Sequence, residues 1–342
     1  MSTTKIFITG GAGFIGSAFV RLLLDAFPDW QVMVFDALTY AGNLDNLRGL
    51  PNSRYSFRRG DIRDSESVLS ALGDSGDVVV NFAAESHVDR SIQSAHEFIT
   101  TNVLGTQVLL DAARKCGVRR FVHISTDEVM GSLPENDETF FTEESPFQPN
   151  SPYAASKAAA EHLVRAAHHT FGLDTVITRC GNNYGPRQFP EKFLPLIIAN
   201  AIKDEPIPVY GDGLNVRDWI YVDDHCRGIL AALENGRPGQ VYNLGARNQR
   251  RNIEVAKSIL DQLGKPHSLL QFVNDRPGHD RRYAIEPTLA ESELRWRPHE
   301  TWESGLARTI DWYVNNEQWV ERARSGAYRE YYAKQYGIEV GA

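Results

Sequence analysis

The glycine-rich run Gly10-Gly11-Ala12-Gly13-Phe14-Ile15-Gly16 constrains the fold of this chain more than any other feature. It follows a short apolar segment, 5–9, and precedes a segment with helical periodicity, 15–26. A glycine turn between a strand and a helix lets backbone N–H groups and the helix N-terminus approach a pyrophosphate. The alternative is a tight turn that binds nothing. In this context the motif predicts a dinucleotide site, with these cofactor-binding residues: Gly10, Gly13, Phe14, Ile15 and Gly16.

An acidic residue follows at the spacing that this motif requires. Asp36 lies 20 residues after Gly16, at the predicted end of the second strand, where a carboxylate can accept hydrogen bonds from the adenosine ribose. No Lys or Arg lies between Asp36 and Asn46, so a 2′-phosphate would face an uncompensated negative charge, which favours NAD over NADP. Simple strand-ending turns remain an alternative for the further cofactor-edge candidates, which are Asp61, Ile62, Ala83 and Ala84.

Apolar and helical segments alternate along the first half of the chain. The segments that resemble buried strands are 5–9, 31–35, 77–82, 121–125 and 174–179, and those with helical periodicity are 15–26, 65–72, 101–115 and 152–171. This alternation predicts an α/β fold in which a doubly wound parallel sheet, a Rossmann fold, carries helices on both faces.

The pattern changes near Cys180 to Gly, Pro and Asn clusters with aromatic residues, which is typical of a loop-rich substrate-binding lobe. The strand-like segment 241–244 is expected to return to the main sheet. We therefore expect two interleaved parts. Residues 1–180 plus about 222–250 form the dinucleotide-binding Rossmann domain, and about 181–221 plus 251–342 form a second, smaller mixed α/β lobe for the substrate.

Composition excludes several classes of protein. The chain has 342 residues, enough for a large core, and no apolar run approaches the ~20 residues of a membrane span. A formal net charge of −8 argues against a general nucleic-acid surface. Three widely spaced cysteines fit reduced thiols and indicate no metal site. Since the N-terminal segment also lacks the features of a signal peptide, we expect a cytoplasmic protein without membrane or nucleic-acid partners.

Tyr153 and Lys157 form a second motif, placed in a helix that Ser151-Pro152 should begin. Spacing of four residues puts both side chains on one helix face. Positive charge from Lys157 and a nicotinamide ring would favour the tyrosinate, which can then take the proton of an alcohol during hydride transfer. The alternative is an ordinary exposed pair, but Ser125, ending the preceding apolar run, supplies a hydroxyl that could help hold the reacting oxygen.

Asp127 and Glu128 are adjacent carboxylic acids just beyond that apolar run. Neighbouring residues of a strand point to opposite faces, so both can reach one ligand only beyond the strand end. That position is the carboxyl edge of the sheet, where doubly wound folds bind ligands. There one group could remove a proton and the other could protonate a leaving hydroxyl, which suits the elimination of water. Solvated loop acids are the alternative.

Several motifs together resemble the dTDP-glucose 4,6-dehydratase family of the extended short-chain dehydrogenase/reductase superfamily. The similarity extends to about Trp312, and its most specific element is Thr126-Asp127-Glu128, an acidic pair that related sugar-nucleotide epimerases lack. The other segments that carry it are 10–17, 36–44, 81–91, 182–186, 215–219 and 275–283.

This resemblance implies an order of events on a glucose ring. Tyr153, assisted by Lys157, would deprotonate the 4-hydroxyl while NAD accepts the C4 hydride, with Thr126 hydrogen-bonding at the same oxygen. Glu128 would remove the C5 proton, Asp127 would protonate the departing C6 hydroxyl, and the hydride would return to C6. The product is a 4-keto-6-deoxy sugar nucleotide, and the family keeps NAD tightly bound because each turnover regenerates it.

The resemblance also implies the groups that bind the nucleotide diphosphate sugar, which is dTDP-glucose in the family. Arg217, Asn252 and Arg276 resemble diphosphate-holding residues. The further substrate candidates are Ser86, His87, Asn182, Lys192, Tyr210 and His279; a structural or solvated role stays open for these side chains, notably His87, Lys192 and Tyr210. Family members are generally homodimers that pack through two helices per subunit, which here would be 101–115 and 152–171.

Two positions depart from the family pattern. Met130 stands where the family has Tyr, and Gly181 stands where it commonly has Ser. Met can fill the volume of the ring but cannot donate a hydrogen bond. We therefore expect the chemistry to be retained and the departures to bear on substrate fit or rate. Two other functions stay open: another NAD-dependent sugar-nucleotide enzyme of this fold, such as a UDP- or GDP-sugar dehydratase or a 4-epimerase, and a catalytically silent NAD-binding sensor.

Overall fold

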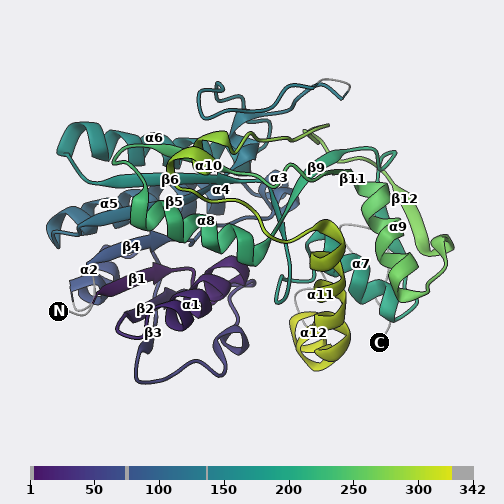
Figure 1. The fold of residues 1–342 in the computed structure, drawn as a ribbon, viewed down its shortest axis with the longest axis horizontal. Helices are drawn as coiled ribbons and strands as arrows, with labels where there is room; N and C mark the ends of the chain where they lie inside the picture. The colour runs from purple at the N-terminus through teal and green to yellow at the C-terminus, as the bar shows by residue number, and fades with distance from the viewer. Residues whose placement is uncertain (1–3, 74–76, 136–137, 326–342) are drawn as a thin grey trace.

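The computed structural model describes residues 4–73, 77–135 and 138–325. A larger part with the main sheet lies beside a smaller part that contains α7, α9, α11 and α12 (Figure 1). Residues 326–342, which the sequence assigns to the smaller lobe, lie outside the described residues. In the described part of the chain, no helix is both long and apolar enough to cross a lipid bilayer.

Seven parallel strands form the main sheet in the order β10-β6-β5-β4-β1-β2-β3. The predicted doubly wound parallel sheet is confirmed, and the segment 241–244 pairs with β6 at one edge. The strands are β1 (Lys5–Thr9), β2 (Gln31–Asp36), β3 (Tyr55–Arg59), β4 (Val78–Asn81), β5 (Arg120–Thr126), β6 (Thr175–Cys180) and β10 (Val241–Leu244).

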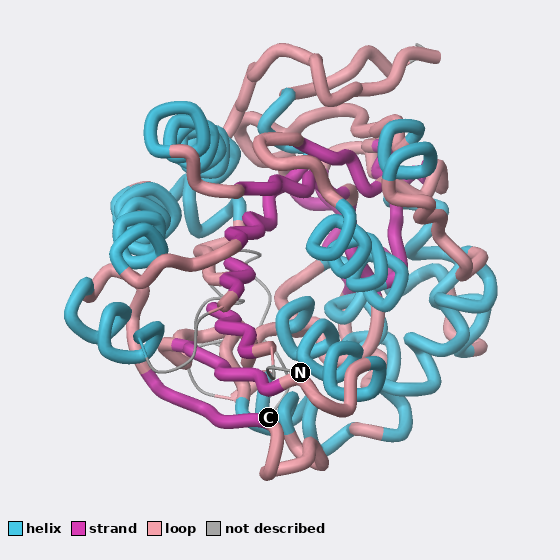
Figure 2. Tube along the Cα trace, turned by 60° about the vertical axis from the view of Figure 1, so that its left-hand side comes forward, coloured by secondary structure: helices cyan, strands magenta, loops and turns pink. Residues whose placement is uncertain are grey.

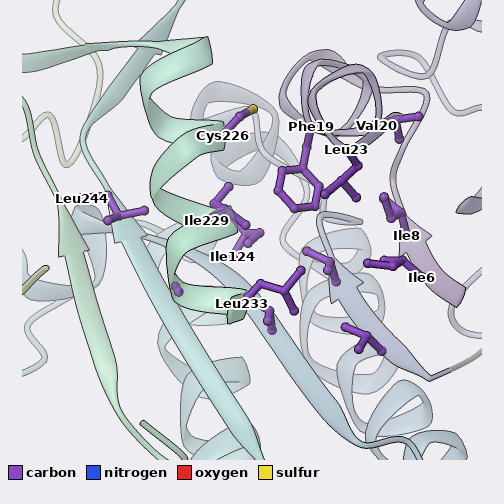
Figure 3. Packing of buried hydrophobic residues seen from close by; sticks show 14 of the residues in the cluster. Ile6, Ile8, Phe19, Val20, Leu23, Ile124, Cys226, Ile229, Leu233 and Leu244 are labelled. Atoms are coloured by element: carbon purple, nitrogen blue, oxygen red, sulfur yellow. The ribbon is translucent and has the colours of Figure 1, made fainter. Parts of the chain in front are cut away.

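Helices cover both faces of this sheet, as Figure 2 shows. One face packs against α1 (Phe14–Ala26), α8 (Val222–Asn235) and α10 (Thr288–Glu293), and the other packs against α2 (Ser65–Gly73), α5 (Thr106–Lys115) and α6 (Pro152–Phe171). Figure 3 shows the first interface, where Phe19 and Leu23 of α1 and Ile229 of α8 meet the side chains of the strands. Burial of this apolar surface on both faces holds the strand ends in fixed positions.

The helix expected over 101–115 is only partly α-helical. It continues from α4 (His96–Phe98) through a π-helical segment, η2 (Ile99–Gly105), into α5. The short helix α3 (Val88–Gln93) is separate, since it ends at Ser94, whose backbone is extended. Apolar periodicity cannot distinguish a π-helical turn from an α-helical one over so few residues. The other short helical turns are η1 (Leu44–Leu47), η3 (Asp127–Met130) and η4 (His267–Leu269).

The smaller part is built around a three-stranded sheet, β11-β9-β7, and a two-stranded sheet, β12-β8. Trp219, Trp302, Tyr313 and Trp319 fill its core. The division of the chain into two interleaved domains stays a prediction. The elements are β7 (Asn182–Tyr184), α7 (Phe193–Ile202), β8 (Ile207–Tyr210), β9 (Val216–Tyr221), β11 (Gln249–Arg251), α9 (Asn252–Leu263), β12 (Leu270–Val273), α11 (Trp302–Asn315) and α12 (Glu317–Ala323).

Candidate active site

A cavity of about 370 Å³ opens at the carboxyl ends of the central strands. Its walls contain every residue that the sequence predicts to contact a dinucleotide: Gly10, Gly13, Phe14, Ile15, Gly16, Asp36, Asp61, Ile62, Ala83, Ala84, Tyr153 and Lys157. The catalytic candidates Thr126 and Glu128 line the same cavity. The sheet therefore brings a dinucleotide-like cradle and a set of acid–base groups into one space.

The glycine loop fits the pyrophosphate of a dinucleotide. Gly10 has φ of +68°, and a Cβ there would lie 2.6 Å from the backbone nitrogen of Ala83. A Cβ on Gly16 would lie 2.3 Å from the Gly10 carbonyl oxygen. Gly13 is the N-cap of α1 and brings no side chain to its first N–H groups. Those N–H groups can meet a phosphate, so the chain can hold the cofactor that its motif predicts.

Asp36 is held at the far end of the cradle by two backbone N–H groups. Its Oδ2 accepts from the Ala12 nitrogen at 2.9 Å and its Oδ1 from the Leu38 nitrogen at 2.8 Å. Burial raises the pKa of Asp36, and these two hydrogen bonds oppose the rise. Arg63 also lines the cavity, but it forms ion pairs with Asp61 at 2.7 Å and with Glu97 at 3.0 Å.

Tyr153 and Lys157 lie in the first two turns of α6, which Ser151 caps by accepting a hydrogen bond from the Ala154 nitrogen at 3.1 Å. Lys157 Nζ donates to the Ile124 carbonyl oxygen at 2.6 Å, and burial lowers the pKa of this amine to about 8. Burial and the charge of Glu128 raise the pKa of Tyr153 well above its usual value, while a hydrogen bond with Thr126 lowers it. The phenol therefore stays protonated until positive charge approaches it.

Asp127 and Glu128 leave the strand direction because η3 begins directly after β5. The Thr126 hydroxyl caps this turn, accepting from the Glu128 nitrogen at 3.3 Å, and lies 3.3 Å from Asp127 Oδ1. The turn places the two acids side by side, which the opposite faces of a regular strand would prevent. Glu128 lines the cavity, whereas Asp127 is buried next to it and is not part of the lining.

The environments of the two acids differ. Asp127 is buried, and burial, Glu128 and Asp218 together raise its pKa well above the usual range. Burial also raises the pKa of Glu128, but Arg276, Arg217 and Lys192 oppose that rise by placing positive charge nearby. Asp127 therefore keeps its proton more firmly than Glu128 does, which provides one acid and one base.

The cations near Glu128 come from three separate segments. Lys192 donates to the Ser86 carbonyl oxygen at 2.6 Å, Arg217 donates to the Asp280 carbonyl oxygen at 2.9 Å, and Arg276 forms an ion pair with Asp89 at 2.9 Å. Such a cluster suits a diphosphate. Asp89 also accepts from the Tyr210 hydroxyl at 2.9 Å. Sequence reasoning missed Asp89 as a site residue, although it lies inside a motif that carries the family resemblance.

The remaining substrate candidates divide into two groups. Ser86, Asn182 and Lys192 line the cavity. The candidates outside its lining are His87, Tyr210, Arg217, Asn252, Arg276 and His279.

Contacts relate some of this second group to the site. The ring of His279 packs edge-on against Tyr210, with centroids 5.9 Å apart, and so joins the Asp89 and Arg276 contacts. His87 is the N-cap of α3, and burial lowers its pKa to about 3. Asn252 begins α9, and its buried Oδ1 has no hydrogen-bond partner among the described residues. The binding roles of all these residues stay predictions.

The structure shows what surrounds Met130 and Gly181, the two residues that depart from the family pattern. Met130 is buried against Phe141 and Tyr283, and its sulfur lies 3.6 Å from Nη1 of Arg179, which is paired with Glu161 at 2.8 Å. Gly181 leaves no room for a side chain, because a Cβ there would lie 2.5 Å from the Asp218 carbonyl oxygen.

The parallel sheet, the glycine loop and a Tyr-x-x-x-Lys helix facing the strand ends define a short-chain dehydrogenase/reductase. Residues 7–309 match the family model described as GDP-mannose 4,6 dehydratase. The dTDP-glucose 4,6-dehydratase of Xanthomonas campestris pv. campestris (strain B100) is 51% identical over 343 residues, which cover 94% of this chain and 96% of that protein. The chain belongs to the dTDP-glucose 4,6-dehydratase family.

Solved structures agree with this assignment. A dTDP-glucose 4,6-dehydratase from Streptomyces venezuelae, crystallised with NAD and dTDP, matches with a TM-score of 0.90 and 50% identity over 93% of this chain and 99% of that one. A UDP-glucose 4-epimerase from Thermotoga maritima is more distant, with a TM-score of 0.84 and 30% identity over 91% of this chain and 99% of that one. The fold is thus shared with epimerases, and the residues at the site must decide between the two reactions.

Proposed function

We propose that the protein is an NAD-dependent hydro-lyase that converts dTDP-glucose to dTDP-4-keto-6-deoxyglucose and water. The observation that carries this proposal is the acidic pair beyond β5. Asp127 and Glu128 stand beside Tyr153 in surroundings that favour the protonated form of one and the ionised form of the other. Water elimination needs both an acid and a base at one place, and oxidation of an alcohol alone does not.

Oxidation prepares the sugar for elimination. When bound, NAD supplies the acceptor for the C4 hydride and returns that hydride to C6 at the end of the cycle. Tyr153 takes the proton of the 4-hydroxyl, and the hydroxyl of Thr126, which hydrogen-bonds Tyr153, holds the same oxygen. Lys157, one turn along α6 and fixed by the Ile124 carbonyl, lies on the Tyr153 face of the helix.

Elimination then uses the acidic pair. A ketone at C4 acidifies the C5 proton, and Glu128, partly exposed to the cavity, removes it. Asp127 delivers its proton to the departing C6 hydroxyl, which leaves as water. Return of the hydride to C6 leaves C5 one proton short, and Glu128, whose acquired proton exchanges with solvent, protonates C5. Tyr153 then holds the proton of the 4-hydroxyl and Asp127 lacks one, and exchange with solvent restores both groups before the next turnover.

Binding of the nucleotide diphosphate is assigned to Lys192, Arg217 and Arg276. All three are near enough to Glu128 to affect its pKa, which places positive charge beside the reacting end of the cavity. A diphosphate there would satisfy these cations and exclude water from the acids. Arg276 is in addition fixed by Asp89, which Tyr210 also holds.

Mass spectrometry in D2O tests the proposed reaction. The purified protein is incubated with dTDP-glucose, UDP-glucose and GDP-mannose in separate reactions, without added NAD. We expect loss of one water and gain of one carbon-bound deuterium from dTDP-glucose alone. Conversion of another donor would change the substrate assignment. An unchanged mass with inverted C4 would indicate an epimerase, and no conversion after NAD is supplied would favour an NAD-binding sensor.

We propose further that the protein is a homodimer in the cytoplasm. Ile99 and Leu104 of η2 are 55% and 52% exposed, which is unusual for large apolar side chains and supports a protein interface on this segment. η2 and α5 pack against α6, so the two helices that the family resemblance implicates are adjacent. The three cysteines are free thiols, as expected in a reducing compartment.

A further inference from the structure

Three polar side chains form a row across the interior of the main sheet. Thr9 of β1 pairs in register with Asn81 of β4, and Asn81 pairs with His123 of β5. All three are buried, and the row ends in apolar residues on both sides, Phe35 of β2 and Ile177 of β6. Polar groups inside an apolar sheet reduce stability unless they are hydrogen-bonded, so the hydrogen-bond partners of these three side chains decide what the row contributes.

Hydrogen bonds run along the row in one direction. The Ala83 N–H donates to Thr9 Oγ1 at 3.3 Å, and the Thr9 hydroxyl donates to Asn81 Oδ1 at 2.6 Å. The amide of Asn81 is thereby oriented with its Nδ2 toward His123 Nδ1, at 3.1 Å. Because Nδ1 accepts this hydrogen bond, the proton of the neutral ring lies on Nε2.

His123 Nε2 faces the catalytic lysine. It lies 3.4 Å from Lys157 Nζ, which donates a hydrogen bond to the Ile124 carbonyl oxygen at 2.6 Å. A ring N–H that points at an amine can donate to the lone pair of the neutral form, whereas it opposes the ammonium form. We propose that His123, oriented by Asn81 and Thr9, is a positioning residue that stabilises the neutral amine of Lys157.

The other groups around Lys157 act in the opposite direction. Glu161, one turn further along α6, and Cys180 at the end of β6 both favour the ammonium form. The charge of Glu161 is largely neutralised by its ion pair with Arg179 at 2.8 Å, and burial keeps the Cys180 thiol protonated by raising its pKa. Burial of Lys157 favours the neutral amine, and the Nε2–H of His123 is the one polar group named here that acts in the same direction.

The consequence concerns the proposed reaction, on which this inference rests for its purpose. A lysine whose pKa lies near neutral pH can both accept and release a proton at the pH at which the protein works. Lys157 lies beside the tyrosine that accepts the proton of the substrate alcohol. A lysine fixed as ammonium could only contribute charge. The polar row thus connects Thr9, which directly precedes the glycine loop, with Lys157 at the reacting end of the site.

Two NMR measurements on the NAD-saturated protein test the proposal. Long-range ¹H–¹⁵N spectra report the tautomer of His123, and we expect the proton on Nε2. With ¹³Cε-labelled lysine, the pKa of Lys157 is read from its chemical shift; the chain has eight lysines, so Lys157→Arg identifies the signal. We expect a value near 8. A proton on Nδ1 would overturn the proposal in the unmodified protein, without any variant.

Variants separate a tuning role from a structural one. His123→Phe removes the donor, and Thr9→Val keeps its shape while freeing the Asn81 amide to turn. We expect the pKa of Lys157 to rise by about half a unit to one unit in the first and by less in the second, since one hydrogen bond is lost. Thr178→Val is the matched control, because Thr178 is a buried β6 residue whose Oγ1 has no hydrogen-bond partner among the described residues.

The proposal would be contradicted if the pKa of Lys157 in both His123→Phe and Thr9→Val were equal to, or lower than, the pKa of Lys157 in Thr178→Val. Reduced thermal stability alone would then identify the row as structural. Neither measurement depends on turnover, so a failure here leaves the proposed dehydration intact, and a failure of dehydration leaves the tautomer and the pKa to be judged on their own.

Discussion

At the scale of single residues, environment assigns the roles that the sequence leaves open. Asp127 and Glu128 are adjacent carboxylic acids, and the chain alone does not say which holds a proton. The structure buries Asp127 beside Asp218 and places Glu128 within reach of three cations. Desolvation and like charge favour the protonated acid, whereas nearby cations favour the carboxylate, so the positions of the two residues support the proposed division into one acid and one base.

Replacement of Glu128 by Gln should abolish elimination and leave cofactor binding in place. Gln keeps the shape and hydrogen-bonding capacity of the side chain but cannot accept a proton. We expect the rate of water loss from dTDP-glucose, followed by mass spectrometry, to fall by about 10²- to 10⁴-fold. Retained NAD is measured by its absorbance after denaturation of the protein.

The matched control is Glu97→Gln, the same change in a cavity-lining residue that pairs with Arg63 near the predicted adenosine end. We expect little change in the elimination rate from this variant. Unchanged turnover in Glu128→Gln would mean that the base has been assigned to the wrong residue. Equal loss in both variants would indicate a general effect of charge in the cavity.

Gly181→Ser, which restores the residue common in the family, should destabilise this protein. A Cβ at this position would lie 2.5 Å from the Asp218 carbonyl oxygen, a backbone atom that cannot move alone. We expect the free energy of unfolding in urea to fall by about 1–3 kcal/mol, as for other overpacked sites. Gly73→Ser is the control, since a Cβ there would meet no atom of the described residues within 4 Å. A stability equal to that of the control would show that β7 and β9 separate easily.

At the scale of secondary-structure elements, the sequence predicts the strands and helices that have a clear apolar periodicity. It misses those that form because of their pairing with neighbouring segments. Strand β1 and helix α6 match their predicted bounds because each has a clear apolar pattern and, for α6, a Ser-Pro start. Strand β3 was not predicted, because it is an edge strand with partly exposed residues and no continuous apolar run. The π-helical form of η2 has no signature in the spacing of apolar residues.

The residues of the candidate site divide in the same way, into those that local sequence predicts and those that it does not. Residues in local motifs, such as the glycine loop and Tyr153 with Lys157, could be placed because their spacing has a physical meaning. Asp89, Asp218 and His123 could not be assigned from spacing, since their roles depend on contacts with residues more than thirty positions away, such as Arg276 and Lys157. Such contacts become visible only when the sheet and the smaller lobe are assembled.

The junction of α8 and β7 should make the protein sensitive to acid. His225 of α8 is buried, its Nδ1 lies 2.8 Å from Asn183 Oδ1, and burial lowers its pKa to about 3 from a usual 6.5. Between these values the unfolded chain binds a proton that the folded chain excludes. Stability should therefore be lost as pH falls from 6.5 toward 3, with a slope of up to about 1.4 kcal/mol per pH unit from this residue.

Urea unfolding at pH 7 and pH 4.5 measures this slope. His225→Gln cannot titrate, so we expect it to lose less stability between the two values than the unmodified protein does, although it is less stable at pH 7. His169→Gln, at an exposed position of α6, should leave the slope unchanged. A slope in His225→Gln as steep as in the unmodified protein would assign the acid sensitivity to other groups, such as His87.

At the scale of the whole molecule, the site depends on two parts of the chain that the sequence separates. The acid–base groups come from β5, η3 and α6 of the larger part, whereas Arg217 and Arg276 come from β9 and from the loop after β12. Because these cations also oppose the rise in the pKa of Glu128, we expect docking of the smaller part both to position the diphosphate and to favour the carboxylate form of the proposed base. The packing of the two parts against each other and the protonation of Glu128 are therefore linked.

The exposed surface of η2 leads to a prediction about assembly. Ile99 and Leu104 are five residues apart in a π-helical segment, so both face the same side of it. If this side is buried between two subunits, Leu104→Asp should place an unpaired charge in an apolar interface and shift the protein from dimer to monomer. Sedimentation equilibrium over a range of protein concentrations measures the change as an increase in the dimer dissociation constant, which we expect to be tenfold or more.

Phe272→Asp distinguishes this interface from any exposed apolar side chain. Phe272 of β12 is 62% exposed, more than Leu104, but β12 belongs to the smaller part and lies away from α6 (Figure 1). We expect this variant to remain dimeric. A protein that is monomeric without substitution, or dissociates equally in both variants, would contradict the assignment of the interface. Because η2 leads into α5, which packs on α6 behind Tyr153 and Lys157, dissociation should also reduce the elimination rate if the partner subunit holds these helices in place.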